Sequence, residues 1–155
     1  MSVFIFGDFM KLLVILGPNL NMVGIRKREV YGSISADDIN KMIIDYANDK
    51  GVDCEVYQSN HEGCLIDKIH STLRNYDGVI INPGAYTHYS YALRDAIECV
   101  AEVPFVEVHM SDISRREDFR RISVTKDVCI NQIMGYGEMS YLMAVDYLIE
   151  VLNAR

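Results

Sequence analysis

The sequence alternates between short apolar runs and segments with helical periodicity, and this alternation limits the possible folds more than any other feature. The first run, Lys11–Leu16, is too short for a typical helix and is stopped by Gly17 and Pro18, so it predicts a buried strand. The same reasoning predicts four more strands, at Asp53–Gln58, 78–81, 104–108 and 128–133.

The segments between these runs carry apolar residues at helical spacing. Ser35 is placed to cap a helix that ends at Gly51. Further helical segments are predicted at 62–76, 89–102, 115–121 and 137–152. Such an order implies a parallel sheet covered by helices on both faces. With five strands and right-handed crossovers, the predicted fold class is α/β, a flavodoxin-like three-layer sandwich with a five-stranded parallel sheet.

A length of 155 residues, of which 50% are hydrophobic, fits one domain with one core. The first ten residues, MSVFIFGDFM, are mostly apolar, but they are short and lack the basic start and the cleavage site of a signal peptide. We therefore expect an extension at 1–9 followed by a single domain at 10–155. No segment has the apolar length needed to cross a bilayer, so no membrane partner is expected.

The charge and the cysteines narrow the function classes. A net charge of −7 repels phosphate backbones, so no nucleic-acid partner is expected, although local groups could still hold a small anion. The four cysteines form no CxxC pair, which is typical of reduced thiols in a cytoplasmic protein. The four histidines show no HxH or HExxH pattern, so no metal site is predicted.

Nearly every unusual polar residue follows the end of a predicted strand, in the loops 17–35, 59–63, 82–90 and 109–121. Ligands of open α/β sheets bind beyond the carboxyl ends of the strands. The pattern therefore predicts one site that is built from these loops.

Two histidines stand in these loops. Asn82 and His88 flank a Pro-Gly turn, although Asn82 alone fits ordinary turn chemistry equally well. If the next helix reaches back far enough, Asp95 shares a face with His88; otherwise Asp95 is a solvated or helix-terminal carboxylate. A lone histidine is more often structural, but His109 at the expected end of the fourth strand is placed for proton transfer.

Four arginines lie within the segment 115–121. On a helix, Arg116 and Arg120 would repel each other at i,i+4 spacing, and a bound carboxylate would relieve that repulsion. Taken alone, the segment is more typical of a solvated charge cluster balanced by Glu117 and Asp118.

The first loop contains Arg26 and Tyr31. The usual interpretation is a solvated arginine and a packing tyrosine. A guanidinium beside the phenol could also lower its pKa from about 10 to about 8, which requires about 2.7 kcal/mol. The resulting tyrosinate could abstract a proton next to a ketone.

These loops together resemble the type II 3-dehydroquinate dehydratase family, in order and spacing, over roughly residues 11–150. The matching segments are GPNLNMVG at 17–24, Arg26, YG at 31–32, QSNHEG at 58–63, INPGAYTH at 81–88, Ser90, ALRDA at 92–96, EVHMS at 107–111 and RREDFR at 115–120.

The resemblance implies dehydration of 3-dehydroquinate to 3-dehydroshikimate through an enolate, without metal or cofactor, in the shikimate pathway. It implies Tyr31 as the base, Arg26 as its activator, Asn19 as the holder of a water on the enolate oxygen, and His109 as the acid. The substrate-binding set that it implies is Asn82, His88, Asp95, Met110, Ser111 and Arg120, with Arg116 at the rim. It also implies a cytoplasmic homo-dodecamer built from trimers.

The chain departs from the family pattern at several positions. Lys27 and Arg28 replace a usual Glu-Pro after the catalytic arginine, which bears on loop closure, and Asp112 replaces an asparagine and adds charge near the carboxylate site. The remaining departures are Leu16 for asparagine, Tyr89 for a small residue and Ile122 for histidine.

Two other functions compete with the dehydratase. A flavodoxin-like module for a flavin or nucleotide is disfavoured because no P-loop, GxGxxG or Ser/Thr-Gly-rich phosphate loop is present. A non-catalytic scaffold is disfavoured because it has no physical need for all the polar groups that the loops retain.

Overall fold

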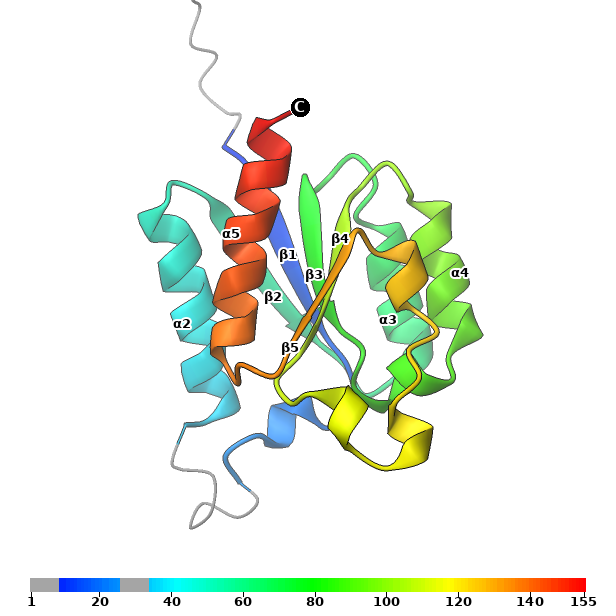
Figure 1. The fold of residues 1–155 in the computed structure, drawn as a ribbon. Coiled ribbons are helices and arrows are strands. Elements are labelled where there is room, and N and C mark those ends of the chain that lie inside the picture. Colours follow the sequence, from blue (N-terminus) through cyan, green and yellow to red (C-terminus); the bar gives the residue numbers. More distant parts are fainter. Residues whose placement is uncertain (1–8, 26–33) are drawn as a thin grey trace, which may run out of the picture.

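The computed structural model describes residues 9–25 and 34–155, which form a parallel sheet between two layers of helices (Figure 1). The strand order is β2-β1-β3-β4-β5. The strands are β1 (Lys11–Leu16), β2 (Asp53–Gln58), β3 (Gly78–Asn82), β4 (Phe105–His109) and β5 (Asn131–Met134). The long helices are α2 (Ala36–Asp49), α3 (Glu62–His70), α4 (Tyr91–Cys99) and α5 (Met139–Asn153). The predicted flavodoxin-like α/β sandwich is confirmed.

Side chains of the central strands divide between two apolar cores. Leu12 and Val14 of β1 pack on one face, in the core that α2 and α5 cover. Leu13 and Ile15 pack on the other face, against α3 and α4. Successive strand residues point to opposite faces, so a strand covered on both sides must be apolar throughout. This explains why β1 is a continuous run without alternation.

Helix α2 begins and ends where the sequence predicts. Ser35 and Asp38 form a capping box, in which each side chain accepts a hydrogen bond from the backbone N–H of the other, at 3.1 and 3.0 Å. After the C-terminal residue Asp49, Gly51 takes a left-handed conformation with φ of 75°.

Two helices are shorter than predicted. Helix α3 ends at His70 rather than at 76, and Arg74 takes a left-handed φ of 66° in the turn that follows. Helix α4 begins at Tyr91 rather than at 89, because the Ser90 side chain caps it by accepting the Leu93 N–H at 3.0 Å. Residues 84–88 form a separate 3-10 helix. His88 therefore does not share a continuous helix with Asp95, so the condition for a shared helix face is not met.

The chain after β4 also differs from prediction. The segment 115–121 forms no continuous helix; it contains parts of two 3-10 turns, Ile113–Arg115 and Asp118–Arg120. Strand β5 begins at Asn131 and not at 128, because Lys126–Val128 forms another 3-10 turn. No helix within residues 9–25 and 34–155 is long and apolar enough to span a membrane.

The loops after β1 and β3 pack tightly against each other. The Gly17 N–H donates to Asn82 O at 2.8 Å, and a Cβ at Gly17 would lie 2.4 Å from Pro83 O. Only glycine allows the two backbones to approach this closely. The contact lies where the strand order reverses, between the crossovers to β2 and to β4. The contact fixes the position of the two loops relative to each other at the carboxyl edge of the sheet, where ligands bind in folds of this type.

Candidate functional site

A cavity of about 250 Å³ lies at the carboxyl edge of the sheet. It is lined by Leu20 after β1, by Asn82, Gly84, Ala85 and His88 at the end of β3 and after it, and by His109, Met110, Ser111, Ile113, Arg116 and Arg120 at the end of β4 and after it. Three of the four predicted loops thus meet at one hollow, as expected for this sheet topology.

Seven of the predicted site residues line this cavity: Asn82, His88, His109, Met110, Ser111, Arg116 and Arg120. Asn19 is exposed and directly precedes the lining residue Leu20. Asp95 is exposed on α4 and does not line the cavity of its own chain. Arg26 and Tyr31 lie outside the described residues, as do Lys27 and Arg28. The roles assigned to all these residues stay predictions.

The loop 59–63, which follows β2, supports the site without lining the cavity. Asn19 has a left-handed backbone with φ of 69°, and its N–H donates to Asn60 Oδ1 at 3.0 Å. Gln58 Nε2 donates to the same oxygen and to Gly17 O, both at 3.1 Å. These amides hold the first loop in a backbone conformation that few residues adopt readily. Sequence reasoning did not single out Gln58 or Asn60 as site residues.

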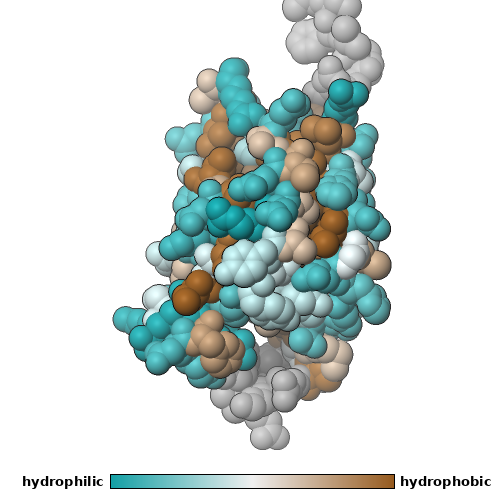
Figure 2. Space-filling model, turned by 90° about the vertical axis from the view of Figure 1, so that its right-hand side faces the viewer, coloured by the Kyte–Doolittle hydropathy of each residue, from teal (hydrophilic) through white to brown (hydrophobic). Residues whose placement is uncertain are grey.

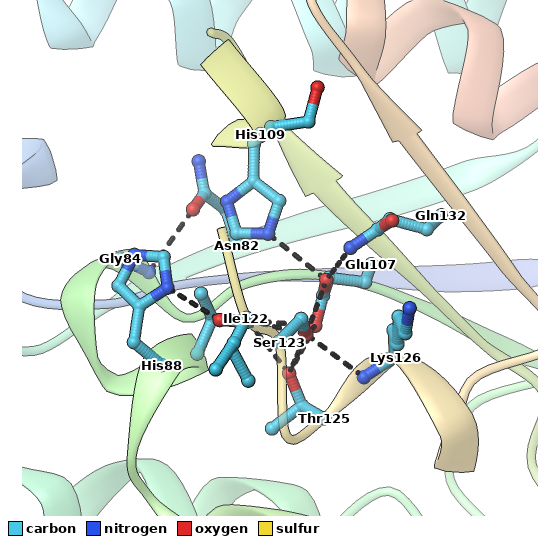
Figure 3. Close-up of polar contacts among 12 residues, drawn as sticks. Asn82, Gly84, His88, Glu107, His109, Ile122, Ser123, Thr125, Lys126 and Gln132 are labelled. Atoms are coloured by element: carbon cyan, nitrogen blue, oxygen red, sulfur yellow. Dashed lines mark hydrogen bonds and ion pairs between the residues drawn. The ribbon is translucent and has the colours of Figure 1, made fainter. Parts of the chain in front are cut away.

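The His88 ring is anchored by the backbone. Its Nδ1 lies 2.7 Å from Ile122 O, and a carbonyl oxygen can only accept, so Nδ1 carries a proton (Figure 3). In the neutral ring, Nε2 is then a free acceptor for a donor in the cavity. Phe119 packs edge-on to this ring, with 6.4 Å between centroids.

His109 is held by a buried carboxylate. Its Nε2 lies 3.0 Å from Glu107 Oε2, and the Glu107 side chain is fully buried (Figure 3). Because a carboxylate only accepts, Nε2 must carry a proton, which leaves Nδ1 as the ring nitrogen for a ligand. Glu107 and His109 are two residues apart on β4, so they lie on one side of the strand. Sequence reasoning did not include Glu107 among the site residues, although the E-x-H spacing was a usable signal.

The Glu107 carboxylate is surrounded by donors besides His109 (Figure 3). Its oxygens accept from Thr87 Oγ1 at 2.9 Å, Ser123 Oγ at 2.9 Å, Thr125 Oγ1 and Gln132 Nε2. Burial by itself raises the pKa of Glu107. The hydrogen bond and charge of His109, with the bonds from Thr125 and Gln132, outweigh burial and lower that pKa from 4.5 to about 2. The donors around Glu107 therefore stabilise its ionised form.

Comparison with known proteins shows what this arrangement belongs to. Residues 10–149 match the family model described as Dehydroquinase class II. The chain belongs to this family. A 3-dehydroquinate dehydratase of Thermotoga neapolitana is 56% identical over 142 residues, which cover 92% of this chain and 96% of that relative. Another, of Carboxydothermus hydrogenoformans, is 51% identical over 146 residues and covers 94% of each chain.

Solved class II dehydroquinases share the fold. The type II dehydroquinase of Butyrivibrio crossotus superimposes with a TM-score of 0.88 at 51% identity, covering 92% of this chain and 99% of that one. The enzyme of Propionibacterium acnes gives a TM-score of 0.85 at 35% identity with the same coverage. The family resemblance that the loop motifs indicated is confirmed.

In this class II dehydroquinase chain, the arginines at the rim differ in their partners. Three pair with an acidic residue three positions earlier: Arg115 with Asp112 at 3.9 Å, Arg120 with Glu117 at 2.7 Å, and Arg121 with Asp118 at 3.4 Å. Arg116 makes no ion pair with any residue in the described ranges. The predicted repulsion between Arg116 and Arg120 on a helix does not apply, because the segment is not helical. Of the two arginines that line the cavity, Arg116 is therefore the one without an acidic partner among the described residues.

Two of the departures from the family pattern have structural partners. The Asp112 carboxylate accepts from Ser114 N at 3.0 Å and from Ser114 Oγ, and these bonds lower its pKa. The Asp112 carboxylate therefore stabilises the turn at Ser114, and Asp112 does not line the cavity. Tyr89 is exposed and stacks edge-on against Tyr86, with 5.6 Å between ring centroids.

The depressed pKa of Glu107 predicts a specific loss of stability in acid. The ionised group stabilises the folded state fully above its ordinary pKa of 4.5, and this stabilisation disappears as the pH falls toward about 2. The gap corresponds to on the order of 3 kcal/mol. Urea unfolding between pH 7 and pH 3 should therefore show a steeper decline for the native chain than for Glu107→Gln. Glu102→Gln, at an exposed glutamate, should keep the native slope. Equal slopes for the native chain and Glu107→Gln would contradict the assignment.

Proposed function

We propose that this chain is a 3-dehydroquinate dehydratase, which eliminates water from 3-dehydroquinate to give 3-dehydroshikimate in the shikimate pathway. The observation that carries the proposal is His109, which lines the cavity and is backed by the buried Glu107 carboxylate at 3.0 Å. Membership of the class II dehydroquinase family and the names of the relatives support the same activity.

The reaction needs a base, a group that stabilises the enolate and an acid for the departing hydroxyl. Tyr31, as a phenolate stabilised by Arg26, removes the proton next to the ketone. The electrons of that C–H bond form the enolate, whose oxygen is stabilised by a water held at Asn19. When the enolate collapses, the C–O bond breaks and the hydroxyl leaves as water with a proton from His109. Neither a redox reagent nor a metal is required by these steps.

Glu107 suits His109 to the acid role. Its carboxylate fixes the Nε2–H, so the proton that is given to the hydroxyl comes from Nδ1. The buried carboxylate also holds the orientation of the ring at the cavity, and histidine is the side chain that most often performs this kind of proton transfer. After transfer the neutral ring keeps its Nε2–H and remains oriented for the next cycle.

The substrate's polar groups match the rest of the lining. Its carboxylate is held by Arg116, by Ser111 and by the backbone of Met110 and Ser111. Arg120 is fixed by Glu117 at 2.7 Å, so it is a pre-positioned donor for a ring hydroxyl. His88 Nε2 and the Asn82 amide bind further hydroxyls.

The catalytic unit is the single domain 10–155, with residues 1–9 as an extension, and the family match beginning at residue 10 supports this division. The protein acts in the cytoplasm as a homo-dodecamer built from trimers. Exposed aromatic side chains at Tyr89, Tyr91 and Tyr136 support contacts between chains, and Figure 2 shows hydrophobic side chains at the surface of the face that it draws. Asp95 would bind substrate in a neighbouring chain's cavity, because it does not line its own.

The first experiment follows absorbance after 3-dehydroquinate is added to metal-free protein. Formation of the conjugated product, insensitive to borohydride, supports the dehydratase and excludes a Schiff base.

Tyr31→Phe should remove turnover while circular dichroism remains native. Full activity in that variant would remove Tyr31 from its role. A folded native chain with no turnover would favour the scaffold, and a bound yellow chromophore would favour the flavin module.

Arg116 is expected to bind the substrate carboxylate directly. Arg116→Ala should raise KM roughly 10- to 100-fold, because it removes a charge-assisted hydrogen bond to an anion. Arg115→Ala is the matched control, since Arg115 pairs with Asp112 and does not line the cavity. Similar KM values for the two variants would contradict the assignment.

The proposed assembly gives a test for Asp95. Assemblies made only of Asp95→Ala chains or only of His109→Ala chains should be inactive. Mixed assemblies should recover part of the activity, because some sites then combine His109 of an Asp95→Ala chain with Asp95 of a neighbouring His109→Ala chain. Light scattering should give about twelve times the chain mass of 17.7 kDa. A fully active monomer would contradict both the dodecamer and the role of Asp95 in a neighbouring chain's site.

A further inference from the structure

The amide of Asn82 is held from two sides by groups that belong to different layers of the fold. Asn82 is the last residue of β3, is buried and lines the cavity. Its Oδ1 accepts the Gly84 N–H at 3.1 Å, and its Nδ2 donates to the Tyr141 hydroxyl at 2.9 Å. Gly84 lies in the loop after β3, whereas Tyr141 lies on α5 and is 2% exposed. Figure 3 shows the Asn82 oxygen directed at Gly84 and the nitrogen turned away from it.

These partners fix which end of the amide faces which way. A backbone N–H only donates, so the atom opposite Gly84 must be the oxygen, and the nitrogen must face Tyr141. A flipped amide would place two donors against each other at Gly84. Burial raises the pKa of Tyr141 to about 12, although the bond from Asn82 partly opposes this, so the residue is a neutral phenol that can accept the N–H.

The remaining capacity of the amide is then defined. An asparagine side chain has two N–H donors and two acceptor lone pairs. Gly84 occupies one lone pair and Tyr141 one N–H, which leaves one donor and one acceptor. Such a neighbouring pair suits a hydroxyl group, because a hydroxyl both donates and accepts.

We propose that Tyr141 is a positioning residue for substrate binding, which acts through Asn82 by fixing the amide orientation that a substrate hydroxyl recognises. This inference rests on the proposed function, because it assumes a polyhydroxylated substrate in the cavity. Tyr141 does not itself line the cavity. Its effect therefore appears in binding and not in the proton-transfer steps that His109 performs.

Tyr141→Phe removes the phenol oxygen and little else. The Asn82 N–H that it paired with is left buried without a partner, so the amide reorients or binds water, and the substrate hydroxyl loses its prepared contact. KM should rise roughly 5- to 30-fold, with kcat changed less than about threefold. Tyr46→Phe is the matched control: its hydroxyl bonds Asp146 at 2.8 and 2.9 Å on the surface between α2 and α5, so KM should stay native.

A double-mutant cycle separates positioning from packing. Steady-state kinetics of Asn82→Ala, with and without Tyr141→Phe, should give KM values within about twofold of each other, because the second change has no amide left to act on. An unchanged KM in Tyr141→Phe alone would overturn the inference. An equal rise in both backgrounds would overturn it as well, because Tyr141 would then act independently of Asn82.

A second measurement separates this inference from the proposed function. The side-chain amide protons of Asn82 should exchange slowly with solvent in the native chain and Tyr46→Phe, and faster in Tyr141→Phe, as followed by NMR. Unchanged exchange in Tyr141→Phe would overturn the positioning role whatever the enzyme does. Faster exchange in a chain whose native form does not turn over 3-dehydroquinate would place the failure on the proposed function alone.

Discussion

The site is organised around one buried negative charge. The Glu107 carboxylate has no solvent exposure, and an ion in such a place is tolerable only if donors replace the water it has lost. Here the donors come from the 3-10 helix after β3, from β4 itself, from β5 and from the segment that leads to β5. Four parts of the chain thus converge because one anion requires them. The same convergence orients the histidine that faces the cavity.

A second constraint acts on the other side of the cavity, where the loops after β1 and β3 touch through Gly17 and Asn82. Backbone packing there is close enough to exclude a methyl group. The Asn82 carbonyl belongs to this backbone contact, while its side chain reaches toward α5. The binding surface is therefore rigid on the side of the central strands. Its arginine rim, in contrast, is built from short turns, and the ion pairs of Arg115 and Arg121 there are exposed and therefore individually weak.

Much of the fold was predictable because each strand is a short apolar run with a clear stop. Strands β1 and β2 were predicted to the residue. The start of β5 was missed because Val128 and Cys129 are apolar for another reason: they pack against the core beneath α3 and α4 while still outside the strand. The start of α4 was set by the Ser90 side chain, and a cap one residue after the predicted start of a helix is difficult to recognise among other polar residues.

The candidate site was predictable where loops follow strands and less so where residues act from inside. His109 and Asn82 drew attention as polar residues at strand ends. Glu107 lies within a strand, and its immediate neighbours do not show that hydroxyls 16 to 20 positions away surround its carboxylate. Tyr141 is separated from Asn82 by 59 positions, so its contact with the amide exists only once α5 packs on the sheet. Arg26 and Tyr31 rest on the family resemblance.

Four of the six residues from Arg120 to Thr125 make contacts that build the site, and these contacts are of three kinds. Arg120 reaches the cavity, the Ile122 carbonyl anchors His88, and the hydroxyls of Ser123 and Thr125 bind Glu107. Alternate residues face the carboxylate, so the spacing matters as much as the residue types. A single inserted or deleted residue would move all three groups out of register at once. This stretch is a connection outside the sheet, where insertions and deletions are usually tolerated. Among homologous chains, its length should nevertheless vary as little as the length of a core strand.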